Sequence, residues 1–183
     1  MKFRMLTIAL LSAGMALTAG TTNSPASAAA DTAIAAKLGH EIRMYPRFTI
    51  WDNVTYRVHD GEVELQGQVS QPFKKGDIAR IAQSTPGVRS VTNRLEVLPT
   101  SAFDDRLRIQ IARALFRDPV LSRYAMQPVP PIHIIVNNGH VALEGVVNND
   151  MEKNVAGIRA SGAGLSFGPV ANNLRVENPK TKN

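Results

Sequence analysis

The sequence predicts an α+β protein with two tandem domains of similar build. One observation is that a hairpin pattern occurs twice, over residues 56–69 and 134–147, with alternating strands on both sides of an Asx-Gly pair. Another is that a helical pattern precedes and follows each hairpin, and a strand pattern ends each copy. The predicted order in each domain is therefore α-β-β-α-β, with two helices packed on one face of a three-stranded sheet.

The two turns carry the most specific local signal. A type I′ turn needs positive φ at both central residues, which Asp-Gly and Asn-Gly pairs tolerate. The predicted turn residues are Asp60, Gly61, Asn138 and Gly139. Counting outward from a two-residue loop, Val58 pairs with Val63 and Val136 pairs with Val141. Because this register gathers the apolar side chains of the first hairpin on one face, we expect that sheet to be covered on a single face.

The first domain is predicted to span residues 31–99. Its first helix is expected to be capped by Asp31 or Thr32 and to end at Pro46. The other predicted elements are strands at 54–59 and 62–69, a helix from 72 to about 85 and a strand at 88–98. Asn93 shares the apolar side of this last strand, so we expect a buried amide that is bonded to the backbone.

The second domain repeats the first after a short linker. The predicted segments are a linker at 100–103, the domain at 104–178 and a basic tail at 179–183. Asp104 is expected to cap a helix that stops before Pro119, and these two residues lie 73 positions after Asp31 and Pro46. The hairpins lie 78 positions apart, so the second connector is five residues longer. The remaining predicted elements are a helix from 149 to about 160 and a strand at 169–176.

Residues 1–30 have the pattern of a cleaved signal peptide. Lys2 and Arg4 form a basic start, residues 5–19 are apolar, and Ala26-Ser27-Ala28 offers small residues for cleavage. The alternative is a retained membrane anchor, but the apolar stretch is shorter than the ~20 residues that a spanning helix needs. We therefore expect a periplasmic or secreted protein.

Charge and cysteine content limit the classes of function. The leader holds two of the 21 basic residues and none of the 15 acidic ones, so its removal changes the net charge from +6 to +4. This small excess, together with export, argues against nucleic acid as a partner. The chain has no cysteine, which excludes disulfides and a lipid-modified cysteine after the leader. Each domain must therefore be held by its apolar core.

Two motifs of the first copy resemble a known family. The pattern V-x-D-G-x-V-x-L-x-G-x-V at 58–69 and the pattern G-V-x-x-V-x-N-x-L-x-V at 87–97 are similar to the BON domain of bacterial envelope proteins. A double copy behind a signal peptide resembles the osmotically inducible periplasmic proteins. The second copy departs from the pattern at residues 162–169. The resemblance implies an α+β fold, no catalysis, a role in envelope stress protection, and attachment to phospholipid surfaces or envelope proteins.

No catalytic motif points to an enzyme. The chain lacks a Gly-x-Ser-x-Gly elbow, a Walker loop and a His-Glu-x-x-His helix. The glycine-rich stretch 162–168 follows a helix and precedes a strand, the reverse of the order in phosphate loops, so it is interpreted as a connection. His133 and Glu144 face each other across the second hairpin and are interpreted as a polar pair on the solvent face. No cofactor, metal or small-molecule substrate is expected.

The first helix of the second domain has an unusual outward face. On a helical wheel, two large apolar side chains and three arginines lie opposite the core residues. The candidate lipid-binding residues are Arg106, Ile109, Arg113, Phe116 and Arg117, with Trp51 as an interfacial anchor for the first domain. Such a face suits the headgroup region of an anionic bilayer. The alternatives are a domain contact in which Phe116 packs on the first domain, and half-buried packing of Trp51.

A second function remains open. The outer sheet face of the second domain carries Ile135, Ala142 and Val146, and we expect the first domain or another protein to cover it. The predicted function is that of a non-enzymatic envelope protein that binds anionic phospholipid. The alternative is a protein-protein adaptor or ring-building module that uses strand edges and this apolar face.

Overall fold

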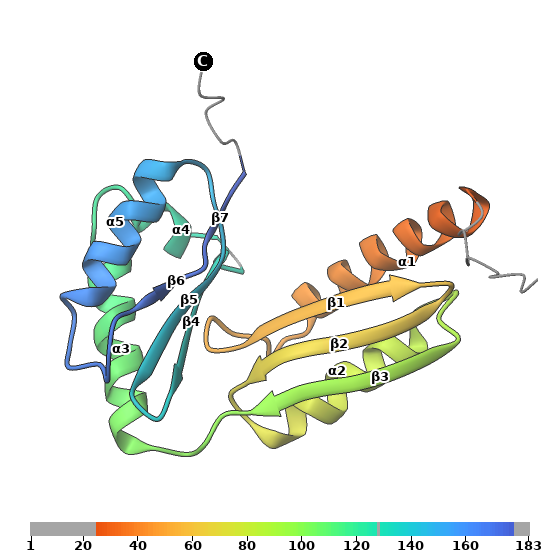
Figure 1. The fold of residues 1–183 in the computed structure, drawn as a ribbon, viewed down its shortest axis with the longest axis horizontal. Coiled ribbons are helices and arrows are strands. Elements are labelled where there is room, and N and C mark those ends of the chain that lie inside the picture. Colours follow the sequence, from red (N-terminus) through yellow and green to blue (C-terminus); the bar gives the residue numbers. More distant parts are fainter. Residues whose placement is uncertain (1–24, 128, 178–183) are drawn as a thin grey trace, which may run out of the picture.

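The computed structural model describes residues 25–127 and 129–177, which form two small α+β domains (Figure 1). Most of the predicted leader, residues 1–24, lies outside the described residues, as does the tail after residue 177. Residues 25–30 form the start of the first helix. Among the described residues, no helix has the length and apolar character needed to cross a membrane.

The first domain has the predicted α-β-β-α-β order. Its elements are α1 (Pro25–Met44), β1 (Asn53–His59), β2 (Glu62–Val69), α2 (Pro72–Ser84) and β3 (Ser90–Val97). Both helices lie behind one face of the sheet in Figure 1. Leu38, Leu65 and Ile78 meet there in a dry core, because each element buries its apolar side and leaves its polar side in water.

The sheet of the first domain has the order β1-β2-β3. β1 and β2 are antiparallel, with Val58 opposite Val63 as predicted. β2 and β3 are parallel and are joined by the crossover helix α2. Asn93 of β3 donates its amide Nδ2 to the carbonyl of Lys75 at 2.9 Å, which confirms a backbone-bonded amide, although the residue is only half-buried.

The second domain repeats this arrangement with two differences. Its elements are α3 (Ala102–Phe116), α4 (Ser122–Ala125), β4 (Ile132–Asn137), β5 (His140–Val147), α5 (Asp150–Ser161), β6 (Ala171–Asn172) and β7 (Arg175–Val176). The short helix α4 was not predicted, and its Tyr124 reaches the second core. The predicted strand 169–176 is split into β6 and β7, which both pair with β5 in one register.

Three predicted helix starts need correction or refinement. α1 begins at Pro25 rather than at Asp31, because the alanine-rich residues before Asp31 favour helix. α3 begins at Ala102, so the predicted linker loses its last two residues. Ser101 caps α3, and its hydroxyl accepts from the backbone N–H of Asp104 at 3.2 Å. α5 begins at Asp150 with Asn149 as its cap, close to the predicted start.

The connector between α1 and β1 joins the two domains. The backbone N–H of Ile134 donates to the carbonyl of Ile50 at 2.7 Å, so the connector lies along the outer edge of β4. Ile50 and Trp51 pack against the second core, and the ring of Phe48 lies 5.4 Å from that of His133. The prediction of a solvent-facing His133 is therefore wrong, because the connector covers this side chain.

The outer sheet face of the second domain is covered in part. Ile135 is only 5% exposed, while Ala142 and Val146 are half-buried. Val146 and His133 line a groove together with residues of β1 from the first domain. The face is therefore covered only in part, and Val146 opens onto a groove that the two domains line together.

Candidate functional site

Helix α3 presents a row of three arginines to solvent. Leu107, Ile111 and Leu115 are buried in the second core and fix the orientation of the helix. Because residues three to four positions apart share a helix face, the opposite side carries side chains spaced by seven and four residues. Arg106 and Arg113 occupy that side, Arg117 continues it as the C-cap residue of α3, and all three are exposed. We call these three residues the arginine row.

The members of the arginine row have no ion-pair partner among the described residues. Arg106 donates its Nε only to the carbonyl of Ala102, at 3.2 Å. Other arginines of this domain are neutralised: Arg123 pairs with Glu152 and Arg159 pairs with Asp118. The positive charge of the row is therefore free to attract an anionic partner.

The predicted apolar companions of the row have different surroundings. Ile109 is 44% exposed, as a membrane-facing residue requires. Phe116 is half-buried and packs against the core of its own domain, rather than on the first domain. Trp51 is half-buried against the same core, so it belongs to the joint between the domains. Of these three predicted apolar companions, only Ile109 is an exposed side chain beside the arginine row.

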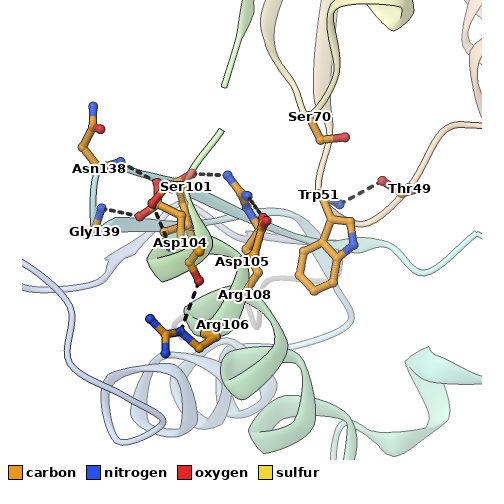
Figure 2. Close-up of polar contacts among 12 residues, drawn as sticks. Thr49, Trp51, Ser70, Ser101, Asp104, Asp105, Arg106, Arg108, Asn138 and Gly139 are labelled. Atoms are coloured by element: carbon orange, nitrogen blue, oxygen red, sulfur yellow. Dashed lines mark hydrogen bonds and ion pairs between the residues drawn. The ribbon is translucent and has the colours of Figure 1, made fainter. Parts of the chain in front are cut away.

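A groove between the domains lies beside α3. Trp51, Arg108 and Ile109 line it together with the end of β3. Figure 2 shows the side chains of Trp51 and Arg108. Arg108 is buried, and it donates to the carbonyl of Val136 at 2.6 Å and to the Asp105 carboxylate at 2.5 Å. This arginine therefore attaches α3 to β4, and it is not available to a ligand.

Both hairpin turns are held by an aspartate from the first helix of the same domain. Asp60, Gly61, Asn138 and Gly139 have φ values of 49°, 73°, 50° and 78°, which confirms the predicted turns. The Asp104 carboxylate accepts from the N–H groups of Asn138 and Gly139, both at 2.8 Å (Figure 2). Asp31 does the same for the first turn, at 2.7 and 2.8 Å. The predicted capping role of these two aspartates is therefore wrong.

A buried polar cluster in the first domain has the appearance of a catalytic pair. The Nζ of Lys74 lies 2.9 Å from the hydroxyl of Ser70 and 2.7 Å from the carboxylate of Asp52. Burial would raise the pKa of Asp52, but hydrogen bonds from Lys74, Ser70 and Thr49 outweigh it and hold the pKa below its usual value. Lys74 donates to the Ser70 hydroxyl, and that hydroxyl in turn donates to the Asp52 carboxylate at 2.8 Å, so Lys74 is a donor to Ser70 in this arrangement and not its base. The cluster ties the connector to α2.

The remaining titratable groups do not assemble a metal site in the described part of the chain. No three His, Cys, Asp or Glu residues there are placed to share an ion. Burial lowers the pKa of His133, the first of the predicted polar pair. Its partner Glu144 lies opposite it in the register, and the amide of Asn173 donates to the Glu144 carboxylate at 2.7 Å.

The family of the chain follows from a comparison with protein-family models. The model of the BON domain matches residues 30–99 and again residues 104–178. The chain belongs to the BON domain family. The two matches cover the two domains described above, so the arginine row lies on the first helix of the second BON domain. The family is linked to phospholipid binding and is generally non-enzymatic.

Comparisons with individual proteins add little. No curated protein matches the chain. Among solved structures, CdsD, a structural protein of the type III secretion system of Chlamydia trachomatis, is 15% identical with a TM-score of 0.27, over 79% of this chain and 91% of that one. A structure of its C-terminal domain has the same identity and TM-score, over 78% and 96% of the two chains. Scores this low carry no argument about function.

Proposed function

We propose that this protein is exported to the cell envelope and binds anionic phospholipid surfaces through its second BON domain. The observation that carries the proposal is the arginine row, in which three exposed cations share one side of α3 and none forms an ion pair with a described residue. Arginine forms paired hydrogen bonds with phosphate, the charged group of phospholipid heads. Ile109 supplies apolar surface beside the row.

The first domain shows that the fold does not require this row. At the positions 73 residues earlier, Ala33, His40 and Met44 replace the three arginines, and Ala36 replaces Ile109. The helix of the first domain packs on its sheet without them. Because these four positions are exposed in both domains, this difference supports a role in binding rather than in folding.

The expected affinity from charge alone is modest. An arginine close to an anionic membrane contributes ~1 kcal/mol, so three together contribute ~3 kcal/mol, or roughly a hundredfold in affinity. The attraction decays over a Debye length of ~8 Å at physiological ionic strength. Binding is therefore expected to be reversible, salt-sensitive and dependent on additional apolar contact.

Vesicle flotation tests this function. A chain of residues 31–183 lacks the apolar leader and retains every residue of both cores, which begin at Ile34. It is expected to float with vesicles that contain phosphatidylglycerol and to stay behind with phosphatidylcholine alone. The variant Arg106→Glu/Arg113→Glu is expected to lose most of this binding.

The matched control is Arg57→Glu/Arg89→Glu, which makes the same charge change at exposed positions of the first domain. This control is expected to float nearly as well as the parent. Equal losses in both variants would reduce the row to a net-charge effect, and a parent that never floats would reject the lipid function.

A protein-protein adaptor or ring-building module is the second candidate. One observation favours it: β3 lies at the edge of its sheet, and no further described strand pairs with its outer side. An exposed edge can accept a strand from another protein. The apolar sheet face that was expected to serve this function is already covered in part by the first domain. An adaptor would remain in solution in the flotation experiment.

A further inference from the structure

The second domain carries three exposed apolar side chains at one end. Leu165 is 83% exposed, Phe167 is 59% exposed and Phe103 is 37% exposed. Phe103 belongs to the first turn of α3, and the other two belong to the loop between α5 and β6. We call these three residues the apolar tip. Exposed apolar surface concentrated at one place marks a site of contact with another apolar body.

The apolar tip is held in place by the second hairpin turn. The backbone N–H of Phe167 donates to the carbonyl of Gly139 at 2.8 Å. The Phe167 ring lies so close to Gly139 that an added Cβ there would be 2.6 Å from it. The rings of Phe103 and Phe167 stack with centroids 5.4 Å apart and an interplanar angle of 18°. These contacts hold Phe167 and Phe103 of the tip in place on the domain.

The first domain folds without such a tip. At the same end it has Ala30 in the position of Phe103. Its loop between α2 and β3 spans only residues 85–89, against residues 162–170 between α5 and β6. Pro86 and Gly87 stand in the shorter loop and line a hollow together with Ala30. The longer loop and its large apolar side chains are thus additions to the common fold.

The first residue of the arginine row, Arg106, lies next to the apolar tip. Arg106 lines a shallow hollow together with Phe103 and Leu165, so the arginine row starts beside the tip. The two carboxylates of the first turn of α3 are engaged elsewhere, Asp104 with the hairpin turn and Asp105 with Arg108. The tip therefore meets an uncompensated cation, which is the pattern of interfacial membrane contacts, with apolar groups below the phosphates and arginine at their level.

We propose that the apolar tip is the part of the second BON domain that inserts into the bilayer. This inference rests on the proposed function and names the contact that adds to the arginine row. Leu165 and Phe167 enter the boundary between headgroups and acyl chains, Phe103 supports them, and Arg106 binds a lipid phosphate. Phe116 and Trp51, which are half-buried against the second core, then remain outside the apolar layer.

A fluorescent label at position 165 tests the insertion directly. The chain has no cysteine, so Leu165→Cys in residues 31–183 accepts a single environment-sensitive nitrobenzoxadiazole label. Vesicles of phosphatidylglycerol and phosphatidylcholine are expected to shift its emission to the blue, and lipids with a nitroxide on the acyl chain are expected to quench it. A label at the exposed Gln83, near the corresponding end of the first domain, is expected to do neither.

The contribution of the apolar tip to vesicle affinity is measured with two matched variants. Leu165→Ser is expected to weaken vesicle binding about tenfold or more, because burial of a leucine side chain is worth that much. Its thermal midpoint is expected to stay unchanged, since the side chain is exposed in the free protein. Met126→Ser removes a side chain that is 88% exposed in the turn after α4, and it is expected to bind as the parent does.

The outcomes separate this inference from the proposed function. If Arg106→Glu/Arg113→Glu loses binding while Leu165→Ser retains it and the label at 165 stays in water, the tip inference is rejected and the lipid function stands. If the parent binds no vesicles, both are rejected. If sedimentation shows dimers that Leu165→Ser dissociates, and the label does not enter vesicles, the tip is a contact between two copies and the inference is also rejected.

Discussion

At the scale of single residues, the two aspartates under the hairpin turns hold the most demanding positions. Asp104 is fully buried, and its two carboxylate oxygens each accept one N–H group of the turn. In a turn with positive φ at two successive residues, the backbone N–H groups of both residues point to the same side. A single carboxylate placed there can accept a hydrogen bond from each of them. The same contact recurs at Asp31, so it belongs to the repeated fold.

Removal of this carboxylate is expected to destabilise the second domain. Asp104→Ala leaves the part-buried N–H of Asn138 and the buried N–H of Gly139 without their acceptor, and each lost bond to a charged group costs ~1.5–3 kcal/mol. We expect a loss of about 3–5 kcal/mol in the free energy of unfolding, measured by urea titration. Asp150→Ala, at an exposed position of α5, serves as the control and is expected to change stability little. A loss below ~1 kcal/mol for Asp104→Ala would contradict this role.

At the scale of elements, α3 combines two tasks on opposite sides. Its inner side fixes the helix in the second core through leucine and isoleucine, and its outer side carries the arginine row. The helix rises ~1.5 Å per residue, so Arg113 lies roughly 10 Å and Arg117 roughly 16 Å farther along the axis than Arg106. The apolar tip lies at the Arg106 end. The three arginines are therefore not equivalent if the tip inserts first.

Single charge reversals along α3 are expected to have graded effects. Arg106→Glu should weaken binding to phosphatidylglycerol vesicles by about tenfold or more, because reversal removes ~1 kcal/mol of attraction and adds repulsion. Arg113→Glu should weaken it less and Arg117→Glu least, since the attraction decays over ~8 Å. Titration of each variant with vesicles at constant salt measures the order. Equal losses at all three positions would instead indicate that α3 lies flat on the membrane.

At the scale of the whole molecule, the connector of the first domain completes the second. Ile50 bonds to the edge of β4, Trp51 packs on the second core, and Phe48 covers His133. Burial lowers the pKa of His133, and this effect outweighs the opposing influence of Asp52 and Glu144. The joint between the domains therefore favours the neutral imidazole.

Acid is expected to loosen this joint. A histidine with a lowered pKa in the folded state contributes its full stability above its ordinary pKa of 6.5, and that stability is lost as the pH falls below this value. Trp51 is the only tryptophan, so its emission reports the joint. Between pH 7.5 and 5 the emission is expected to shift to the red, more strongly than in His133→Gln. His140→Gln, an exposed control, should keep the parental response, and an identical response in His133→Gln would contradict the role of His133.

Local pattern was sufficient for much of this architecture. The Asx-Gly turns, the strand register counted from them and the core sides of the helices could all be predicted, because each depends on a short period or on one turn conformation. The start of α1 could not be placed, since helix propensity continues through Ala26–Ala30 without a stop signal. The repeat itself indicated which α3 residues depart from the common fold.

Tertiary structure alone decided which side chains remain available to a partner. The pattern treated Phe116, Trp51 and His133 as candidates for a surface, but each is covered by residues distant in sequence or by the core of the second domain. The apolar tip had no period to reveal it, and only the packing of Phe167 on Gly139 holds that ring in place on the domain. Periodicity in the sequence identifies which side of a helix or strand is buried against its own sheet. The exposure of a side chain on the other side depends on every segment that packs against it, and those segments come together only in the folded chain.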